Sequence, residues 1–146
     1  MIIFVDITSS NRQECISLSV SENQKNFVAA NSDSLEEAAQ NPGMRPAGIS
    51  NDGKLIGFAM YSNSSNSNKS WIIRFMIDKS YQRKGYGKEA LSKLIQLLFE
   101  KYSASDIRLC VEPENIIAIK FYENFGFQPT GEKWDNELIY ELKVKR

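Results

Sequence analysis

The chain has 146 residues, of which 42% are hydrophobic and 11% aromatic, which is enough for the core of one ordinary domain. We therefore expect residues 1–146 to form a single domain. Eighteen basic and eighteen acidic residues cancel, and this balance argues against nucleic-acid binding, which usually needs a basic excess or a basic face. Histidine is absent from the sequence, which excludes imidazole catalysis and the Ser-His-Asp and Cys-His nucleophile systems.

The chain shows no targeting or metal-binding pattern. Residues 1–5 lack the basic start of a signal peptide, and no apolar run approaches the roughly 20 residues of a membrane span. We expect a cytoplasmic protein that does not enter a membrane. In that compartment Cys15 and Cys110 are predicted to be buried thiols and not a disulfide. The carboxylates lack the Asp-x-Asp spacing of a cation-binding loop, so no metal site is predicted.

The first forty residues predict a strand and two short helices. Residues 2–6 are apolar and strand-like, and Asn11 stands where it could cap a helix. Ser34 and Glu37 have the spacing of a capping box, which predicts a second helix that ends before Pro42. The apolar residues of the first helix are Cys15, Ile16, Leu18 and Val20.

The middle of the chain predicts antiparallel strands. Residues 51–53, Asn-Asp-Gly, separate two strand patterns at 47–50 and 54–61, which is typical of a tight hairpin. The Ser/Asn-rich residues 62–70 are too polar to bury and predict a loop. Residues 71–77, rich in β-branched and aromatic side chains, predict the next strand.

The second half predicts two strand-helix units followed by a hairpin. Residues 106–111 form the next strand, Asn115 is placed to cap a helix, and Gly126 to end it. The tail, 128–134 and 137–144, predicts a final hairpin. A strand-helix-strand order implies a parallel crossover, so we expect an α/β fold with a mixed sheet and helices on both faces. The apolar stripe of the long first helix is Leu91, Leu94, Ile95, Leu98 and Tyr102.

Residues 82–88, Gln-Arg-Lys-Gly-Tyr-Gly-Lys, join the strand to the long helix and predict an anion-binding loop. Gly85 and Gly87 have no Cβ, so backbone N–H groups can approach a ligand closely. The helix directs its unpaired N–H donors and its positive dipole end toward the same space. The cations around this loop are Arg83, Lys84 and Lys88.

The spacing of this loop excludes two common phosphate sites. The loop of nucleotide triphosphatases needs glycine where Gln82 stands and serine or threonine where Glu89 stands. The dinucleotide fingerprint needs three glycines near the first strand, whereas this loop has two and lies in mid-chain. The remaining pattern, Gln-x-x-Gly-x-Gly, resembles the acyl-CoA pyrophosphate loop of the GNAT superfamily of N-acetyltransferases.

A second motif extends this resemblance. It reads Asn115-x-x-Ala118-x-x-x-Tyr122-Glu123-x-x-Gly126-Phe127. With the order of elements, the two motifs are similar to the GNAT fold over nearly the whole chain. Residues 22–29, 45–46 and 57–61 resemble, more narrowly, bacterial spermine/spermidine or diamine acetyltransferases.

The resemblance implies a binding site for acetyl-CoA as co-substrate. The backbone of Phe75, Met76 and Ile77 would pair with the pantetheine arm as an added strand does. Asn115 and Ala118 would lie near the thiol end of the cofactor. The residues implied to hold the pyrophosphate are Gln82, Arg83, Lys84, Gly85, Tyr86, Gly87 and Lys88.

Amine acetylation requires two proton movements. The amine must lose a proton before it attacks, and the departing thiolate is helped by a donor. The resemblance assigns the donor role to Tyr122, whose alternative role is that of a core aromatic. The glutamate suggested as base in human-type polyamine acetyltransferases corresponds to Ile73 here. Glu112, or an acid of the N-terminal helices acting through water, is the expected substitute.

These observations predict an enzyme that transfers the acetyl group of acetyl-CoA to a small polycationic amine, spermine or spermidine, by direct attack in a ternary complex. A peptide amine, a protein lysine or an aminoglycoside remains an alternative acceptor, and an idle acyl-CoA sensor an alternative function. The family also implies a possible homodimer. The acids predicted to bind the amine are Glu22, Glu36, Glu37, Glu112 and Glu114.

Overall fold

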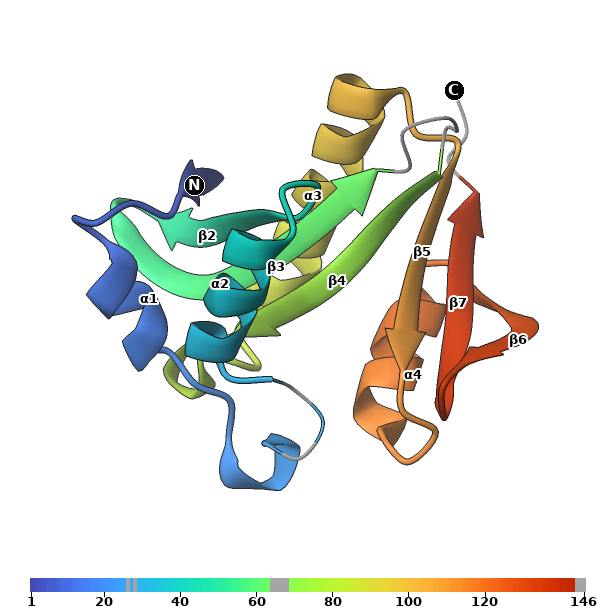
Figure 1. The fold of residues 1–146 in the computed structure, drawn as a ribbon. Helices are drawn as coiled ribbons and strands as arrows, with labels where there is room; N and C mark the ends of the chain where they lie inside the picture. Colours follow the sequence, from blue (N-terminus) through green and yellow to red (C-terminus); the bar gives the residue numbers. More distant parts are fainter. Residues whose placement is uncertain (26, 28, 64–68, 144–146) are drawn as a thin grey trace.

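The computed structural model describes residues 1–25, 27, 29–63 and 69–143. In this part of the chain one mixed sheet has the strand order β1-β2-β3-β4-β5-β7-β6 (Figure 1). The strands are β1 (Ile2–Asp6), β2 (Arg45–Asn51), β3 (Lys54–Asn63), β4 (Lys69–Ile77), β5 (Asp106–Val111), β6 (Gln128–Trp134) and β7 (Glu137–Lys143). The helices are α1 (Arg12–Ser17), α2 (Asn31–Gln40), α3 (Tyr86–Tyr102) and α4 (Ile116–Asn124), with short 3-10 turns η1 (Glu22–Gln24) and η2 (Lys79–Tyr81).

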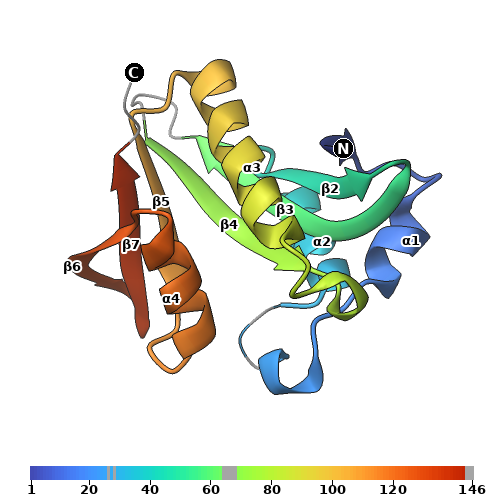
Figure 2. The same cartoon turned by 180° about the vertical axis from the view of Figure 1, so that it is seen from behind.

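The predicted mixed sheet and crossover are confirmed. Strands β4 and β5 pair in parallel and α3 connects them, while the other neighbouring strands pair antiparallel. Helices α3 and α4 lie on one face of the sheet, as Figure 2 shows, and α1 and α2 lie on the other. The predicted hairpins at 51–53 and 135–136 are also present.

The two parallel strands separate partway along their length. Pairing of β4 with β5 runs from Lys69 with Asp106 to Ile72 with Leu109, and beyond this point the strands diverge (Figure 1). The register of β3 on β4 shifts at the same place, leaving Ile73 as an unmatched residue. A β-bulge of this kind bends a strand and increases its local twist. The bulge therefore accounts for the direction in which β4 leaves β5.

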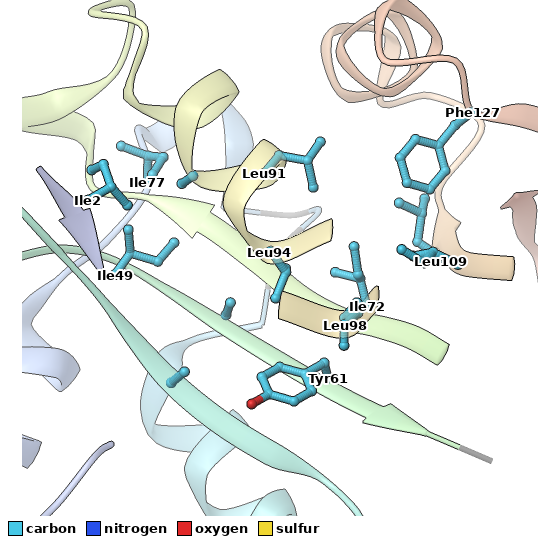
Figure 3. Close-up of a cluster of buried hydrophobic side chains, with 14 of the residues drawn as sticks. Ile2, Ile49, Tyr61, Ile72, Ile77, Leu91, Leu94, Leu98, Leu109 and Phe127 are labelled. Atoms are coloured by element: carbon cyan, nitrogen blue, oxygen red, sulfur yellow. The ribbon is translucent and has the colours of Figure 1, made fainter. Parts of the chain in front are cut away.

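Helix α3 provides the main core through the predicted leucine stripe. Leu91, Leu94 and Leu98 are fully buried against the sheet, as Figure 3 shows together with Tyr61 and Phe127. A second cluster lies under α1 and α2 on the opposite face. Its buried members are Cys15, Val20, Leu35, Leu55, Phe58, Met60 and Met76. The sheet thus has an apolar layer on each face.

The predicted capping box at Ser34 is wrong. Helix α2 begins at Asn31, and Ser34 is a buried residue inside it, whose N–H bonds to the Ala30 carbonyl at 3.1 Å. The buried Asn31 amide donates to the Cys15 carbonyl at 2.9 Å, which joins the start of α2 to α1. A contact between helices thus determines where α2 begins.

The first helix is shorter than predicted. Asn11 is its N-cap residue, but the Asn11 side chain bonds to the Thr8 N–H and the Asp6 carbonyl instead of capping the helix. Helix α1 ends at Ser17, so Leu18 and Val20 lie beyond it.

The boundaries of two strands and the burial of one thiol also differ from the predictions. The strands extend into the predicted loop from both sides, to residues 63 and 69, and residues 64–68 lie outside the described residues, as does Val144. Cys15 and Cys110 are both free thiols, but only Cys15 is fully buried. Cys110 is half-buried because it lies where β5 separates from β4.

Leu94→Ala is expected to lower the free energy of unfolding by about 2–5 kcal/mol, because Leu94 is completely buried and the cavity left behind cannot fully collapse. Urea denaturation followed by circular dichroism measures this loss. Ile116→Ala is the matched control, because Ile116 is 54% exposed. Equal stability of the two variants would contradict the packing described for α3.

Candidate active site

Two cavities lie beside the point where β4 and β5 separate. The first, here called the loop cavity, has a volume of about 390 Å³ and lies between the end of β4, the 82–88 loop and α4. The second, here called the strand cavity, has a volume of about 400 Å³ and lies between β4, β5 and the start of β7. Both are lined by Phe75, Asn115, Ala118 and Tyr122. The two cavities therefore meet at the side chains of α4.

The backbone of the 82–88 loop is suited to an anion. Gly85 is the N-cap residue of α3 with φ +84°, and Arg83 also has a positive φ of +63°. Space is open where a Cβ of Gly85 would stand, so the N–H groups at the start of α3 are accessible. The Gln82 amide donates to the Ile77 carbonyl at 2.9 Å and to Gln24 Oε1 at 3.0 Å, which fixes the loop against the end of β4.

Most residues predicted to bind acetyl-CoA line the loop cavity. They are Phe75, Met76, Ile77, Gln82, Arg83, Gly85, Gly87, Lys88, Asn115, Ala118 and Tyr122. Lys84 and Tyr86 do not line it; Lys84 is exposed and the Tyr86 ring packs on Tyr81. The sequence reasoning missed Ile117 and Phe121, which also line this cavity. Their spacing from Asn115 along α4 could have identified them as residues of the same cavity.

The residues fit an acyl-CoA molecule. Residues 73–77 of β4 have no strand partner on the side of β5, which leaves backbone donors and acceptors for an extended amide chain. The loop cavity begins at this edge and ends at the N-terminus of α3. A helix N-terminus with nearby Arg83 and Lys88 provides the charge that phosphate requires.

Asn115 has one side-chain contact that is fixed by the fold. It is the N-cap residue of α4, and its Oδ1 accepts a hydrogen bond from the Ala118 N–H at 3.3 Å, so the predicted cap is confirmed. This bond holds α4 against both cavities. The role of Asn115 toward a cofactor stays a prediction.

Tyr122 lies between the two cavities. Its ring packs against Phe121 and Phe127, with centroid separations of 5.4 and 5.6 Å. Burial raises the pKa of the Tyr122 hydroxyl well above its ordinary value. No hydrogen bond joins this hydroxyl to another residue in the described part of the chain. The Tyr122 hydroxyl is thus protonated at neutral pH and has no hydrogen-bond partner among the described residues.

The strand cavity contains charged side chains. Arg74 donates through Nη2 to Glu37 Oε1 and through Nη1 to the Ile73 carbonyl, each at 2.9 Å. Glu112 and Glu137 line the same cavity. Burial, and then the nearby Glu112 carboxylate, raise the pKa of Glu137. With Arg74 neutralised by Glu37, Glu112 and Glu137 leave this cavity negatively charged.

The predicted amine-binding acids are distributed unevenly. Glu112 lines the strand cavity, and Glu37 reaches its wall through Arg74. Glu22 is exposed and pairs with Lys25 at 2.7 Å, while Glu36 and Glu114 are exposed and line neither cavity. The structure does not bring these three acids together with Glu112, and their roles stay predictions.

Two charged residues of the strand cavity were missed, Arg74 and Glu137. Arg74 belongs to the predicted strand 71–77. The alternation of side chains between the two faces of a strand does not show which side chain enters a gap between strands. Glu137 comes into place because β7 pairs with β5, ending with Val111 opposite Leu138. Only that pairing could have indicated the position of Glu137, and pairing between strands distant in sequence cannot be recognised from local sequence.

The model of the acetyltransferase (GNAT) family matches residues 12–127. The chain belongs to this family. A spermine/spermidine N(1)-acetyltransferase of Bacillus subtilis (strain 168) is 40% identical over 132 residues, covering 86% of this chain and 87% of the relative. A protein of B. subtilis subsp. natto named "Probable spermine N(1)-acetyltransferase" is 41% identical with the same coverage. The PaiA N-acetyltransferase of Thermoplasma acidophilum, solved in complex with coenzyme A, has a TM-score of 0.74 at 20% identity and 99% coverage of both chains.

The predicted GNAT fold and activity class are confirmed by these matches. This GNAT protein is an acetyl-CoA-dependent N-acetyltransferase, with acetyl-CoA as its co-substrate. Within the described residues, no helix combines the length and hydropathy that a membrane span requires.

Gly87→Ala is expected to weaken acetyl-CoA binding by about tenfold or more without loss of stability. A Cβ at Gly87 would lie 3.6 Å from Phe121 and 3.7 Å from Ile77, which is ordinary contact, but it would fill space in the loop cavity. Alanine in a helix is favoured over glycine by about 0.5–1 kcal/mol, so the fold should be retained. Calorimetry measures the affinity.

Gly43→Ala is the control for this measurement, because Gly43 has open space around its Cβ position and lies outside both cavities. Unchanged acetyl-CoA affinity in Gly87→Ala would contradict the assignment of the loop cavity to the cofactor.

Proposed function

We propose that this GNAT enzyme acetylates a primary amine of spermine or spermidine by direct attack within a ternary complex. The observation that carries the proposal is the negatively charged strand cavity, which meets the loop cavity at Tyr122. An acidic cavity attracts a polycation, and its position beside the cofactor cavity allows both substrates to be bound together. The polyamine acetyltransferases named among the relatives support the same acceptor.

In this proposal, acetyl-CoA is bound mainly by backbone groups. The free edge of β4 at Phe75 to Ile77 would hold the pantetheine arm, and the N–H groups of residues 82–88 would hold the pyrophosphate. Acetyl-CoA supplies the activated acetyl group as a thioester. The cations Arg83 and Lys88 at the rim balance the phosphate charge.

The strand cavity provides a base. An aliphatic ammonium has a pKa of about 10, so the amine must give up a proton before it can attack. Ile73, where the family resemblance implies a glutamate, lines the cavity with an apolar side chain and cannot accept a proton. Glu112 lines the same cavity, and we assign its carboxylate as proton acceptor, directly or through water.

Tyr122 is assigned as the proton donor to the departing thiolate. Its raised pKa keeps the hydroxyl protonated throughout the neutral range, which is the state a donor needs. Tyr122 lines both cavities, which supports this role. No covalent acetyl-enzyme step is required by this assignment.

Tyr122→Phe is expected to lower kcat by about 10²-fold and to leave acetyl-CoA affinity unchanged, because it removes a proton donor and retains the ring. Steady-state kinetics and calorimetry measure the two quantities. Tyr102→Phe is the matched control, since Tyr102 lines neither cavity. A Tyr122→Phe enzyme with wild-type kcat would show that Tyr122 serves only packing.

A thiol-release assay with a panel of amines tests the acceptor. Spermine and spermidine are expected to be turned over, with a KM that rises with salt because ions screen the acidic cavity. Glu112→Gln should lower kcat/KM for spermine by about 10²-fold, whereas Glu100→Gln on the far part of α3 should not. Turnover of peptide amines or an aminoglycoside with no response to millimolar polyamine would refute the polyamine assignment.

A single domain over residues 1–146 and a possible homodimer stay predictions. The absence of nucleic-acid binding likewise rests on the charge balance alone. None of these enters the proposed reaction.

A further inference from the structure

Glu137 occupies a position that the proposed reaction does not use. It is the first residue of β7, half-buried, and it lines the strand cavity with Glu112 and Tyr122. The last residue pair between β5 and β7 is Val111 with Leu138. Glu112 directly follows the end of β5 and Glu137 is the first residue of β7, so both residues stand at the same end of the sheet. Neither forms an ion pair or side-chain hydrogen bond within residues 1–25, 27, 29–63 and 69–143.

Acidic groups outnumber cations around Glu137. Arg74 of β4 is the nearby cation and lowers the pKa of Glu137, but its guanidinium forms its ion pair with Glu37 of α2, at 2.9 Å. Asp135 of the β6–β7 turn and Glu112 both add negative charge near Glu137. The Cys110 thiol on β5 faces it as a neutral group, because burial and the charge of Glu137 raise the pKa of Cys110.

Two carboxylates in a partly buried cavity are costly unless a cation joins them. Glu112 and Glu137 flank the last β5–β7 pair, line one cavity and interact electrostatically, so they lie close enough to meet neighbouring ammonium groups of one polyamine. Only one amine of a polyamine reacts. The remaining ammonium groups keep their charge and need an acceptor that is distinct from the catalytic base.

We propose that Glu137 is a specificity-determining residue of the acceptor site and binds a charged, non-reacting ammonium group of the polyamine. Glu112, beside it, accepts the proton of the reacting amine. This inference rests on the proposed function and deepens it, because it explains how an amine with a second charge is selected. An amine with a single charge gains nothing from Glu137.

The test compares Glu137→Gln and Glu137→Asp with the wild-type enzyme, using spermidine as acceptor. Glu137→Gln should raise the KM for spermidine by about tenfold or more, with kcat within about threefold and the KM for acetyl-CoA unchanged. Glu137→Asp keeps the charge and should recover most of the loss. Glu132→Gln is the control, because Glu132 is exposed on β6 and lines neither cavity.

The pH profile separates binding by charge from a structural role. In the wild-type enzyme, kcat/KM for spermidine should fall as pH drops through the raised pKa of Glu137, because the protonated acid no longer attracts an ammonium group. The reacting amine must also lose a proton, so part of the decline is common to all variants. The decline should be smaller in Glu137→Gln than in the wild-type enzyme, whereas Glu132→Gln should keep the wild-type profile.

A wild-type KM for spermidine in Glu137→Gln, or equal losses in Glu137→Gln and Glu137→Asp, would overturn the inference and leave the proposed function standing. A wild-type enzyme that does not acetylate spermidine would overturn the proposed function, and the role of Glu137 with it.

Discussion

The active site depends on one constraint, which is that β4 and β5 cannot remain paired beyond Ile72 and Leu109. The unmatched Ile73 on β4 bends the strand away from its parallel neighbour. Separation leaves backbone groups of β4 unpaired on one side and opens the strand cavity on the other. A continuous sheet would satisfy those groups internally and would leave no room between the two substrates.

The separated strands are held in place by the surrounding core. Helix α3 buries Leu91, Leu94 and Leu98 against the sheet and fixes β4. Helix α4, on the same face of the sheet (Figure 2), packs Phe121 and Tyr122 against the same core. Apolar burial outside the gap thus helps to offset the cost of the unpaired edge.

Sequence reasoning succeeded where the signal was local. The cap at Asn115, the glycine loop and the leucine stripe of α3 each depend on residues within a few positions of one another, and each is present. The capping box at Ser34 failed because α2 starts four residues earlier, with Ala30 as its N-cap residue and Asn31 in a buried contact with α1. Tertiary contacts of this kind override local propensity.

The acceptor side was harder to predict because its residues come from pairings distant in sequence. Glu137 meets Glu112 only through the register of β7 on β5, and Arg74 meets Glu37 only because α2 covers that face of the sheet. Of the five acids that the sequence suggested, Glu112 lines the strand cavity and Glu37 reaches its wall through Arg74, whereas Glu22, Glu36 and Glu114 do not line it. Glu137, which was not predicted, does line it.

The cap of α4 has a consequence for the polarity of what can bind there. The Asn115 side chain uses its oxygen to accept from the Ala118 N–H, so its amide nitrogen is the end that remains for other partners. Within the described residues, no hydrogen bond engages that nitrogen. Asn115 can therefore offer two N–H donors at the junction of the two cavities, whereas one of the two lone pairs of its oxygen is already used by the helix. The residue that begins the helix thus presents donor groups to whatever occupies that junction.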